Sequence, residues 1–199
     1  MKPDPIVTAV ESALQLNAFG ERAFAERTQQ TPRDYPLILL SPQGRLFNQA
    51  LARELSRYPR LALICGHYEG VDDRVREILD AQEISVGDYV LTGGEIPAMV
   101  IVDAVSRYIA GVVGHPDAPH QDSHATGLLE YPQYTRPLEF RGRRVPEILL
   151  SGHHGEVARW RRREALRRTL ERRPDLLARA ELTEDEKRFL RELGWQAEQ

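Results

Sequence analysis

Apolar residues in the first half of the chain occur in short continuous runs that alternate with stretches of helical spacing. Leu37–Leu40 and Leu61–Cys65 are apolar throughout, as are strands buried on both faces of a sheet. Leu46 to Tyr58 has helical spacing, Asp72 to Leu79 fits a short helix, and Glu95 to Tyr108 fits a strongly apolar one. Strands that alternate with helices predict an α/β domain with a mostly parallel sheet. Further elements are predicted as follows: a helix over Pro5 to Phe19, a polar stretch ending in a turn over Glu21 to Arg33, and a third strand over Ile84 to Leu91.

The second half of the chain has a different texture. His115 to Pro146 is rich in His, Pro, Asp and Gly and shows little periodicity, so it is predicted to be a linker or functional loop followed by short extended pieces. A long helix is predicted over Gly155 to Arg172, and shorter ones over Asp175 to Arg179 and Thr183 to Leu193. We therefore expect three parts: a catalytic domain over 1–113, an interdomain linker over 114–129 and a carboxyl-terminal domain over 130–199.

Charge is distributed unevenly along the 199 residues. The formal net charge is −3, yet the stretch from Arg141 to Arg173 contains eleven arginines and only four glutamates, a local balance of +7. A concentrated basic region is typical of a protein that binds RNA or DNA. A helix that alternates arginine and glutamate is also common as a solvated surface, and this alternative stays open.

Composition excludes several other classes of protein. The longest apolar runs, such as Met99–Val102, are far shorter than the ~20 residues that a membrane-spanning helix needs. No stretch resembles a secretory signal peptide. The single cysteine, Cys65, excludes an intramolecular disulfide framework and a zinc site built from several thiolates. We therefore expect a cytoplasmic protein.

Three predicted strands are each followed by a polar or glycine-containing turn. These turns are Ser41–Gly44, Gly66–Gly70 and Ser85–Gly94. Ligands of open α/β sheets bind beyond the carboxyl ends of the strands, and glycine lets the backbone approach a ligand closely. Three such turns predict a ligand crevice. The sequence contains neither GxGxxG nor GxxxxGK[ST], which excludes a Rossmann dinucleotide loop and a P-loop.

Candidate acid–base groups are concentrated in the linker, which contains His115, His120, Asp122 and His124, and Glu130 follows directly after it. Metal binding by His120, Asp122 and His124 is disfavoured because prolines interrupt any regular element there. Asp122 is a candidate proton acceptor, although an ordinary carboxylate is a weak base unless its site is dry or the proton is first made more acidic. Arg107, near the end of an apolar helix, would supply that acidification by stabilising an oxyanion, or else it is a surface arginine.

Longer motifs contain these turns in a fixed order. They are LSPQGR (40–45), CGHYEGVDDR (65–74), SVGDYVLTGGEIPA (85–98), DAVSR (103–107), GLLEYPQYTRP (127–137) and LLSGHH (149–154). Together they resemble the bacterial tRNA (guanine-N1)-methyltransferase family, and the resemblance runs from Met1 nearly to the carboxyl end. It implies the SPOUT fold: an α/β domain with a parallel sheet and a deep trefoil knot in its carboxyl half, followed by a small, basic, mainly helical domain.

The resemblance also implies a cofactor and its contacts. S-adenosylmethionine would be held in a bent conformation by the knot, at Leu40, Ser41, Pro42, Gly66, Glu69, Ser85, Val86, Gly87, Asp88, Tyr89, Val90, Leu91, Gly93, Gly94 and Pro97. The implied reaction is methylation of N1 of guanosine at position 37 of tRNA. In that reaction Arg107 would stabilise guanine O6 and Asp122 would be the general base. Magnesium is implied as a further requirement, with no metal ligand assigned.

The family's quaternary structure is an obligate homodimer. Each tRNA anticodon arm is held by the catalytic domain of one subunit and the basic carboxyl-terminal domain of the other. Family members also have a segment before the position that matches Met1, with a first sheet strand and a GGGPGM-like loop over the target guanine. One alternative is therefore a truncated chain that binds S-adenosylmethionine and tRNA with little or no catalytic activity. Another is a different SPOUT enzyme, such as a ribose 2′-O-methyltransferase, which would lack the pairing of Asp122 with Arg107.

Overall fold

The computed structural model describes residues 1–16, 35–115 and 117–196. The chain divides into two compact units, Met1–Gly114 and His115–Gln199. The second unit includes almost all of the segment predicted as a linker. The predicted polar stretch Glu21–Arg33 lies outside the described residues, as does the predicted end of the first helix at Phe19.

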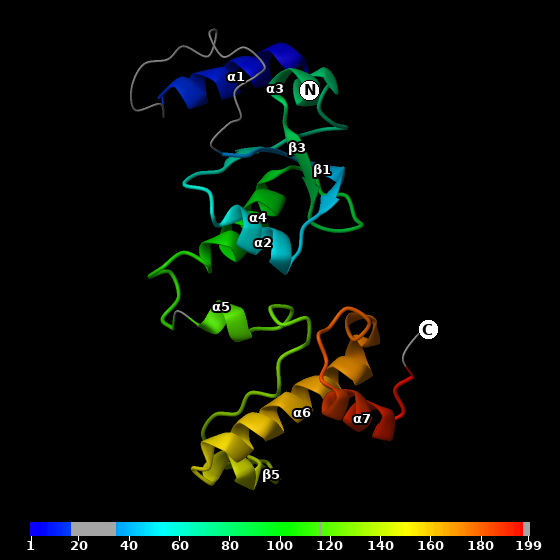
Figure 1. Cartoon of the computed structure of the whole chain (residues 1–199). Helices are drawn as coiled ribbons and strands as arrows, with labels where there is room; N and C mark the ends of the chain where they lie inside the picture. The colour runs from blue at the N-terminus through cyan, green and yellow to red at the C-terminus, as the bar shows by residue number, and fades with distance from the viewer. Residues whose placement is uncertain (17–34, 116, 197–199) are drawn as a thin grey trace. The chain divides into compact units, whose positions relative to one another are not determined.

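The first unit is built on a three-stranded parallel sheet (Figure 1). Its strands are β1 (Leu37–Leu46), β2 (Ala62–Ile64) and β3 (Gln82–Ser85). Their order is β2-β1-β3, so β1 is central and pairs with both neighbours in parallel. The predicted α/β architecture with a parallel sheet is confirmed.

Strand β1 continues beyond the predicted end at Leu40. Ile84 of β3 is paired with both Leu40 and Arg45 of β1, which means that Ser41–Gly44 leaves the ladder and the strand then returns to it. The predicted turn is thus an excursion within a strand rather than the end of one. Strand β1 finally ends at Leu46.

Strand β3 is shorter than the predicted strand over Ile84 to Leu91. It ends at Ser85, whose hydroxyl donates a hydrogen bond to the Gly87 carbonyl (3.0 Å) and accepts one from the Gly87 N–H (3.2 Å). A side chain that bonds the backbone two residues ahead competes with the sheet ladder and forms a turn. The prediction of strand through Leu91 is therefore wrong.

Four helices cover the two faces of the sheet. They are α1 (Pro3–Leu16), α2 (Gln49–Leu55), α3 (Arg74–Leu79) and α4 (Glu95–Ser106), with α1 and α3 on one face and α2 and α4 on the other (Figure 1). Side chains alternate between the faces of a strand. Leu37 and Leu39 accordingly pack with α1 and α3, while Ile38 and Leu40 pack with α2 and α4. This explains why Leu37–Leu40 is apolar at every position.

Helix α2 begins later than the predicted start at Leu46. The side-chain oxygen of Asn48 accepts a hydrogen bond from the Leu51 N–H (3.0 Å), which makes Asn48 the N-cap. An N-cap residue supplies a partner for a backbone donor that the first turn leaves unpaired. The helix therefore starts at Gln49.

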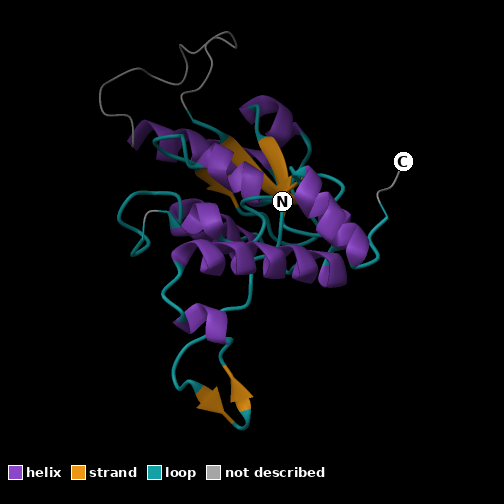
Figure 2. Cartoon of the chain, turned by 60° about the horizontal axis from the view of Figure 1, so that its bottom comes forward, coloured by secondary structure: helices purple, strands orange, loops and turns teal. Residues whose placement is uncertain are grey.

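The second unit is mainly helical (Figure 2). Its elements are α5 (Ala118–Gln121), an antiparallel hairpin of β4 (Glu139–Phe140) and β5 (Arg143–Arg144), the 3-10 turn η2 (Glu147–Leu150), α6 (His154–Arg172), the 3-10 turn η3 (Pro174–Leu176) and α7 (Glu184–Glu192). The helix predicted over Asp175 to Arg179 is thus only a single 3-10 turn. Helix α7 begins with a capping box in which the Thr183 hydroxyl accepts from the Glu186 N–H (3.3 Å) and the Glu186 carboxylate accepts from the Thr183 N–H (2.8 Å).

Thr169 anchors the loop between the predicted linker and the hairpin. It is fully buried on α6, its hydroxyl donates to the Ala165 carbonyl (2.7 Å), and it accepts from the Leu129 N–H (2.9 Å). A buried polar group is stable only when it is hydrogen-bonded, so this geometry fixes the loop on the helix. A separate core is formed here by Leu128, Leu166, Leu177 and Leu190. In the described part of the chain, no helix has the combination of length and apolarity needed to cross a membrane.

Candidate functional site

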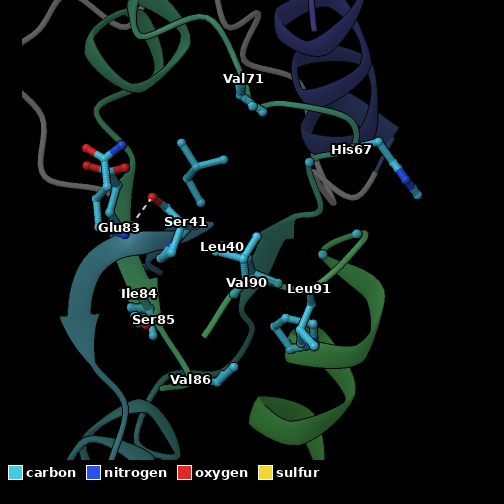
Figure 3. A pocket seen from close by; sticks show the side chains of 18 of the residues that line it. Leu40, Ser41, His67, Val71, Glu83, Ile84, Ser85, Val86, Val90 and Leu91 are labelled. Atoms are coloured by element: carbon cyan, nitrogen blue, oxygen red, sulfur yellow. Dashed lines mark hydrogen bonds between the residues drawn. The ribbon is translucent and has the colours of Figure 1, made fainter. Parts of the chain in front are cut away.

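A cavity of about 560 Å³ lies where the three strands of the first unit give way to their turns (Figure 3). Its walls are the excursion of β1 at Ser41–Gly44, the turn after β2 at Gly66–Gly70, and the segment between β3 and α4. These are the three turns from which the sequence predicts a ligand crevice. The parallel sheet brings them together because the turns after β2 and β3 and the excursion of β1 all lie at the same edge of the sheet.

The predicted cofactor contacts lie on this cavity. All of them line it except Asp88. The cavity is also lined by residues outside the implied set of cofactor contacts: Leu39, Gln43, His67, Tyr68, Gly70, Val71, Asp73, Glu83, Ile84 and Thr92. Most of these lie within or directly beside the quoted motifs, so treating each turn as a whole would have identified them.

Two of the cavity walls are joined by their backbones. The Gly94 N–H donates to the Gly66 carbonyl (2.9 Å), and His67 forms an isolated antiparallel bridge with Gly93. A Cβ atom at Gly94 would lie 2.6 Å from the Cα of Cys65, too close for any real side chain. Glycine is therefore required at 94 by the close approach of the two chains.

The lining of the cavity is acidic. Its carboxylates are Glu69, Asp73 and Glu83, and among the described residues that form its walls there is no lysine or arginine. The negative charge of this lining favours a ligand that carries positive charge over one that carries phosphate. The many exposed backbone groups of the turns supply hydrogen-bond donors and acceptors for the polar parts of such a ligand.

Two ionisable groups beside the cavity have shifted pKa values. A hydrogen bond to its own backbone N–H, followed by one from His67, lowers the pKa of Glu95. Burial, and then the negative charge of Glu95, raises the pKa of the Cys65 thiol. A thiol with a raised pKa is mostly protonated near neutral pH and is a poor nucleophile. The site therefore provides no activated cysteine.

The two predicted catalytic residues belong to different units. Arg107 is the half-buried C-cap of α4, and its N–H donates to the Asp103 carbonyl (3.3 Å). Arg107 does not line the cofactor cavity. Asp122 is the half-buried C-cap of α5 and lies on a second cavity, of about 340 Å³, together with Glu130 and Arg161.

The described residues contain no preformed cluster of metal ligands. Among them, no group of three or more His, Cys, Asp and Glu side chains is placed to hold a metal ion. Magnesium is usually bound by only one or two carboxylates together with water and substrate phosphates.

Many arginines of the basic stretch are engaged within the second unit. Arg159, Arg162, Arg167 and Arg173 form ion pairs with carboxylates, and Arg161 and Arg163 lie over the rings of Tyr131 and Phe189. The bond from Arg162 to Glu186 is 2.6 Å long. Burial alone would raise the pKa of Glu186, but this bond and the one from Thr183 lower it overall. Part of the local positive charge is thus neutralised within the unit, which agrees with the alternative that this arginine- and glutamate-rich helix is a solvated surface.

A smaller set of arginines remains for an external partner. In the described part of the chain, Arg143, Arg168 and Arg172 have no carboxylate within ion-pair distance. Arg143 lies in the hairpin, while Arg168 and Arg172 are one turn apart on α6. They are the best candidates for contacts with phosphate groups.

Comparison with known proteins agrees with the motifs. The family model described as tRNA (Guanine-1)-methyltransferase TrmD matches residues 1–179. A tRNA (guanine-N(1)-)-methyltransferase of Moorella thermoacetica is 56% identical over 194 residues, which are 98% of this chain and 72% of the relative. Proteins of the same name from Dehalococcoides mccartyi and Chloroflexus aurantiacus are 52% and 53% identical, over 97% and 100% of this chain and 72% and 74% of their own lengths. The chain belongs to the TrmD family of tRNA (guanine-N1)-methyltransferases.

Proposed function

We propose that this chain transfers a methyl group from S-adenosylmethionine to N1 of guanosine at position 37 of tRNA. The observation that supports the proposal is that the residues predicted as cofactor contacts, apart from Asp88, all line one cavity. Its volume of about 560 Å³ lies within the range of small-molecule sites. Membership of the family supports the same reaction.

S-adenosylmethionine fits the chemistry of this cavity. It carries a positively charged sulfonium, an ammonium group and a flat adenine. The carboxylates of Glu69, Asp73 and Glu83 attract the positive groups, while Leu40 and Leu91 offer apolar surface to the adenine. When bound, it supplies the methyl group on an electrophilic sulfur. We assign its contacts to the predicted set and place the three turns in the trefoil knot of the SPOUT fold.

Arg107 and Asp122 would act together on the guanine base. The guanidinium of Arg107 donates hydrogen bonds to O6, where negative charge develops as the N1 proton leaves. The carboxylate of Asp122 would accept that proton, and the lone pair on N1 would form a bond to the methyl carbon as the bond from that carbon to the sulfonium sulfur breaks, which leaves S-adenosylhomocysteine. Because a carboxylate is a weak base, the contribution of Arg107 is needed for Asp122 to function near neutral pH.

The proposed enzyme is a cytoplasmic homodimer, and the surface of α4 supports a dimer interface. Ile96, Met99 and Val102 of this helix are 58%, 70% and 54% exposed. A contiguous exposed apolar patch is typical of an interaction surface. Within such a dimer, the basic second unit of one subunit and the first unit of the other would hold the same anticodon arm.

Replacing Met99 with aspartate is expected to shift the chain from dimer to monomer, because the interface would then bury an unpaired charge. Sedimentation equilibrium at micromolar concentration measures the change. Ile78→Asp is the matched control, since Ile78 is 59% exposed on α3 and faces the other side of the sheet. Equal masses for the wild type and Met99→Asp would contradict this interface.

The experiment that tests the function is calorimetric titration of the chain with S-adenosylmethionine, followed by methyl transfer to a tRNA transcript with guanosine at position 37. We expect stoichiometric binding and a product methylated at N1, identified by mass spectrometry of the digested tRNA. A transcript with adenosine at that position is the control. Binding without transfer would favour the alternative of a non-catalytic chain, and failure to bind would reject the cofactor assignment.

A further inference from the structure

The imidazole of His67 is part of the cavity turn but is directed away from the cavity. Figure 3 shows its side chain extending away from Leu40, Val90 and Leu91. Its Nε2 atom forms a short hydrogen bond with Oε1 of Glu95, the first residue of α4. The pair therefore joins two different walls of the cavity.

The backbones of the two turns that carry this pair are also hydrogen-bonded to each other. His67 and Gly93 form an antiparallel bridge, and the Gly94 N–H is bonded to the Gly66 carbonyl. A Cβ atom at Gly93 would lie 2.5 Å from a Glu95 carboxylate oxygen and 2.8 Å from the His67 ring. The side-chain pair thus packs directly against the backbone of the second wall.

We propose that His67 and Glu95 are positioning residues that clamp the Gly66–Gly70 turn to the Thr92–Gly94 turn and so hold the cavity in its binding shape. That the ligand of this cavity is S-adenosylmethionine rests on the proposed function. Neither residue is expected to touch the reacting atoms, because the His67 side chain extends away from Leu40, Val90 and Leu91 (Figure 3) and Glu95 does not line the cavity. Its effect would be on the affinity for S-adenosylmethionine, since both turns belong to the wall that contacts it.

The size of the expected effect follows from the exposure of the pair. The side chains of His67 and Glu95 are 48% and 57% exposed, so water weakens their attraction. Losing a clamp of this kind should weaken S-adenosylmethionine binding by about 1.5- to fivefold rather than abolish it. Catalysis at saturating S-adenosylmethionine should be nearly unchanged.

A double-mutant cycle on His67→Ala and Glu95→Ala tests the clamp. Calorimetry with S-adenosylmethionine should show weaker binding in each single variant, and the double variant should be no weaker than the worse of them. His67→Gln should rescue binding, since its amide can still donate a hydrogen bond to Glu95. Glu77→Ala removes another exposed, ion-paired carboxylate and serves as the control. Additive effects, or loss of kcat with unchanged KM, would overturn the proposal.

Hydrogen exchange of the ligand-free protein separates this inference from the proposed function. The Gly94 amide, which bonds to Gly66, should exchange several-fold faster in His67→Ala and Glu95→Ala than in the wild type, while the amides of β1 stay protected. Unchanged exchange at Gly94 would reject the clamp. If the wild type binds no S-adenosylmethionine but its Gly94 amide responds in this way, the clamp stands and the function fails.

Discussion

Replacing Asp122 with asparagine is expected to slow methyl transfer by about 10²- to 10⁴-fold, the usual contribution of a general base. The amide has nearly the same shape but cannot accept the N1 proton. The affinity for S-adenosylmethionine should not change, because the residues of its cavity all belong to the first unit and Asp122 belongs to the second. Single-turnover transfer to tRNA, with calorimetry for the cofactor, measures both quantities.

Asp117→Asn is the matched control for this variant. Asp117 is an exposed carboxylate in the same segment, and no side-chain capping bond of α5 depends on it. Its replacement should leave the rate within about twofold of the wild type, as is usual for a surface position. Glu130 lies on the same cavity as Asp122 and is the other candidate base. Full activity of Asp122→Asn together with a large loss in Glu130→Gln would transfer the role to Glu130.

Gly94→Ala is expected to damage the cofactor cavity itself. The added methyl group would lie 2.6 Å from the Cys65 Cα and 2.9 Å from the Gly66 nitrogen, and backbone atoms cannot move aside as a flexible side chain can. Overpacking of this kind costs about 1–3 kcal/mol. We expect a lower unfolding midpoint and S-adenosylmethionine binding weakened by at least about tenfold, because the walls can accommodate the methyl group only by separating.

The backbone conformation at Gly94 does not itself forbid alanine, since its φ of −80° and ψ of −6° suit any residue. Steric contact is therefore the only cause to be tested. Gly114→Ala provides the comparison because nothing lies within 4 Å of its Cβ position. Chemical denaturation and calorimetry of both variants should show a large change at 94 and almost none at 114. Wild-type affinity in Gly94→Ala would show that the two turns do not approach as described.

The sheet was predictable from the sequence because its central strand is covered on both faces. Leu37 to Leu40 alternate between two helix layers, so every position is apolar. The same logic failed after Ser85. Val90 and Leu91 have the composition of a strand, yet they are 82% and 37% exposed and line the cavity. The hydrophobic pattern of a sequence does not distinguish apolar residues that line a cavity from apolar residues that pack in a core.

The site was predictable as a set of turns but not as a set of contacts. The glycines in the sequence predict each turn. The hydrogen bond between His67 and Glu95, which are 28 residues apart, depends instead on how the turns pack against one another in the folded chain. The basic stretch shows the reverse problem. The excess of arginine over glutamate can be counted directly in the sequence. Glu186, which forms an ion pair with Arg162, lies on another helix and is missed by that count. Counting charges along the chain therefore overestimates what an RNA partner can use.

The order of the strands has a consequence for how this protein folds during its synthesis. Strand β1 is the first of the three described strands to be made, yet it occupies the centre of the sheet. Its second neighbour, β3, is completed about 40 residues later, which takes roughly 2–8 s at ribosomal rates of 5–20 residues per second. Throughout that interval a strand apolar on both sides has an unpaired edge, the state in which nascent chains associate with one another. The central strand of the folded sheet is thus the one whose second edge stays unpaired until the last of the three described strands has been made.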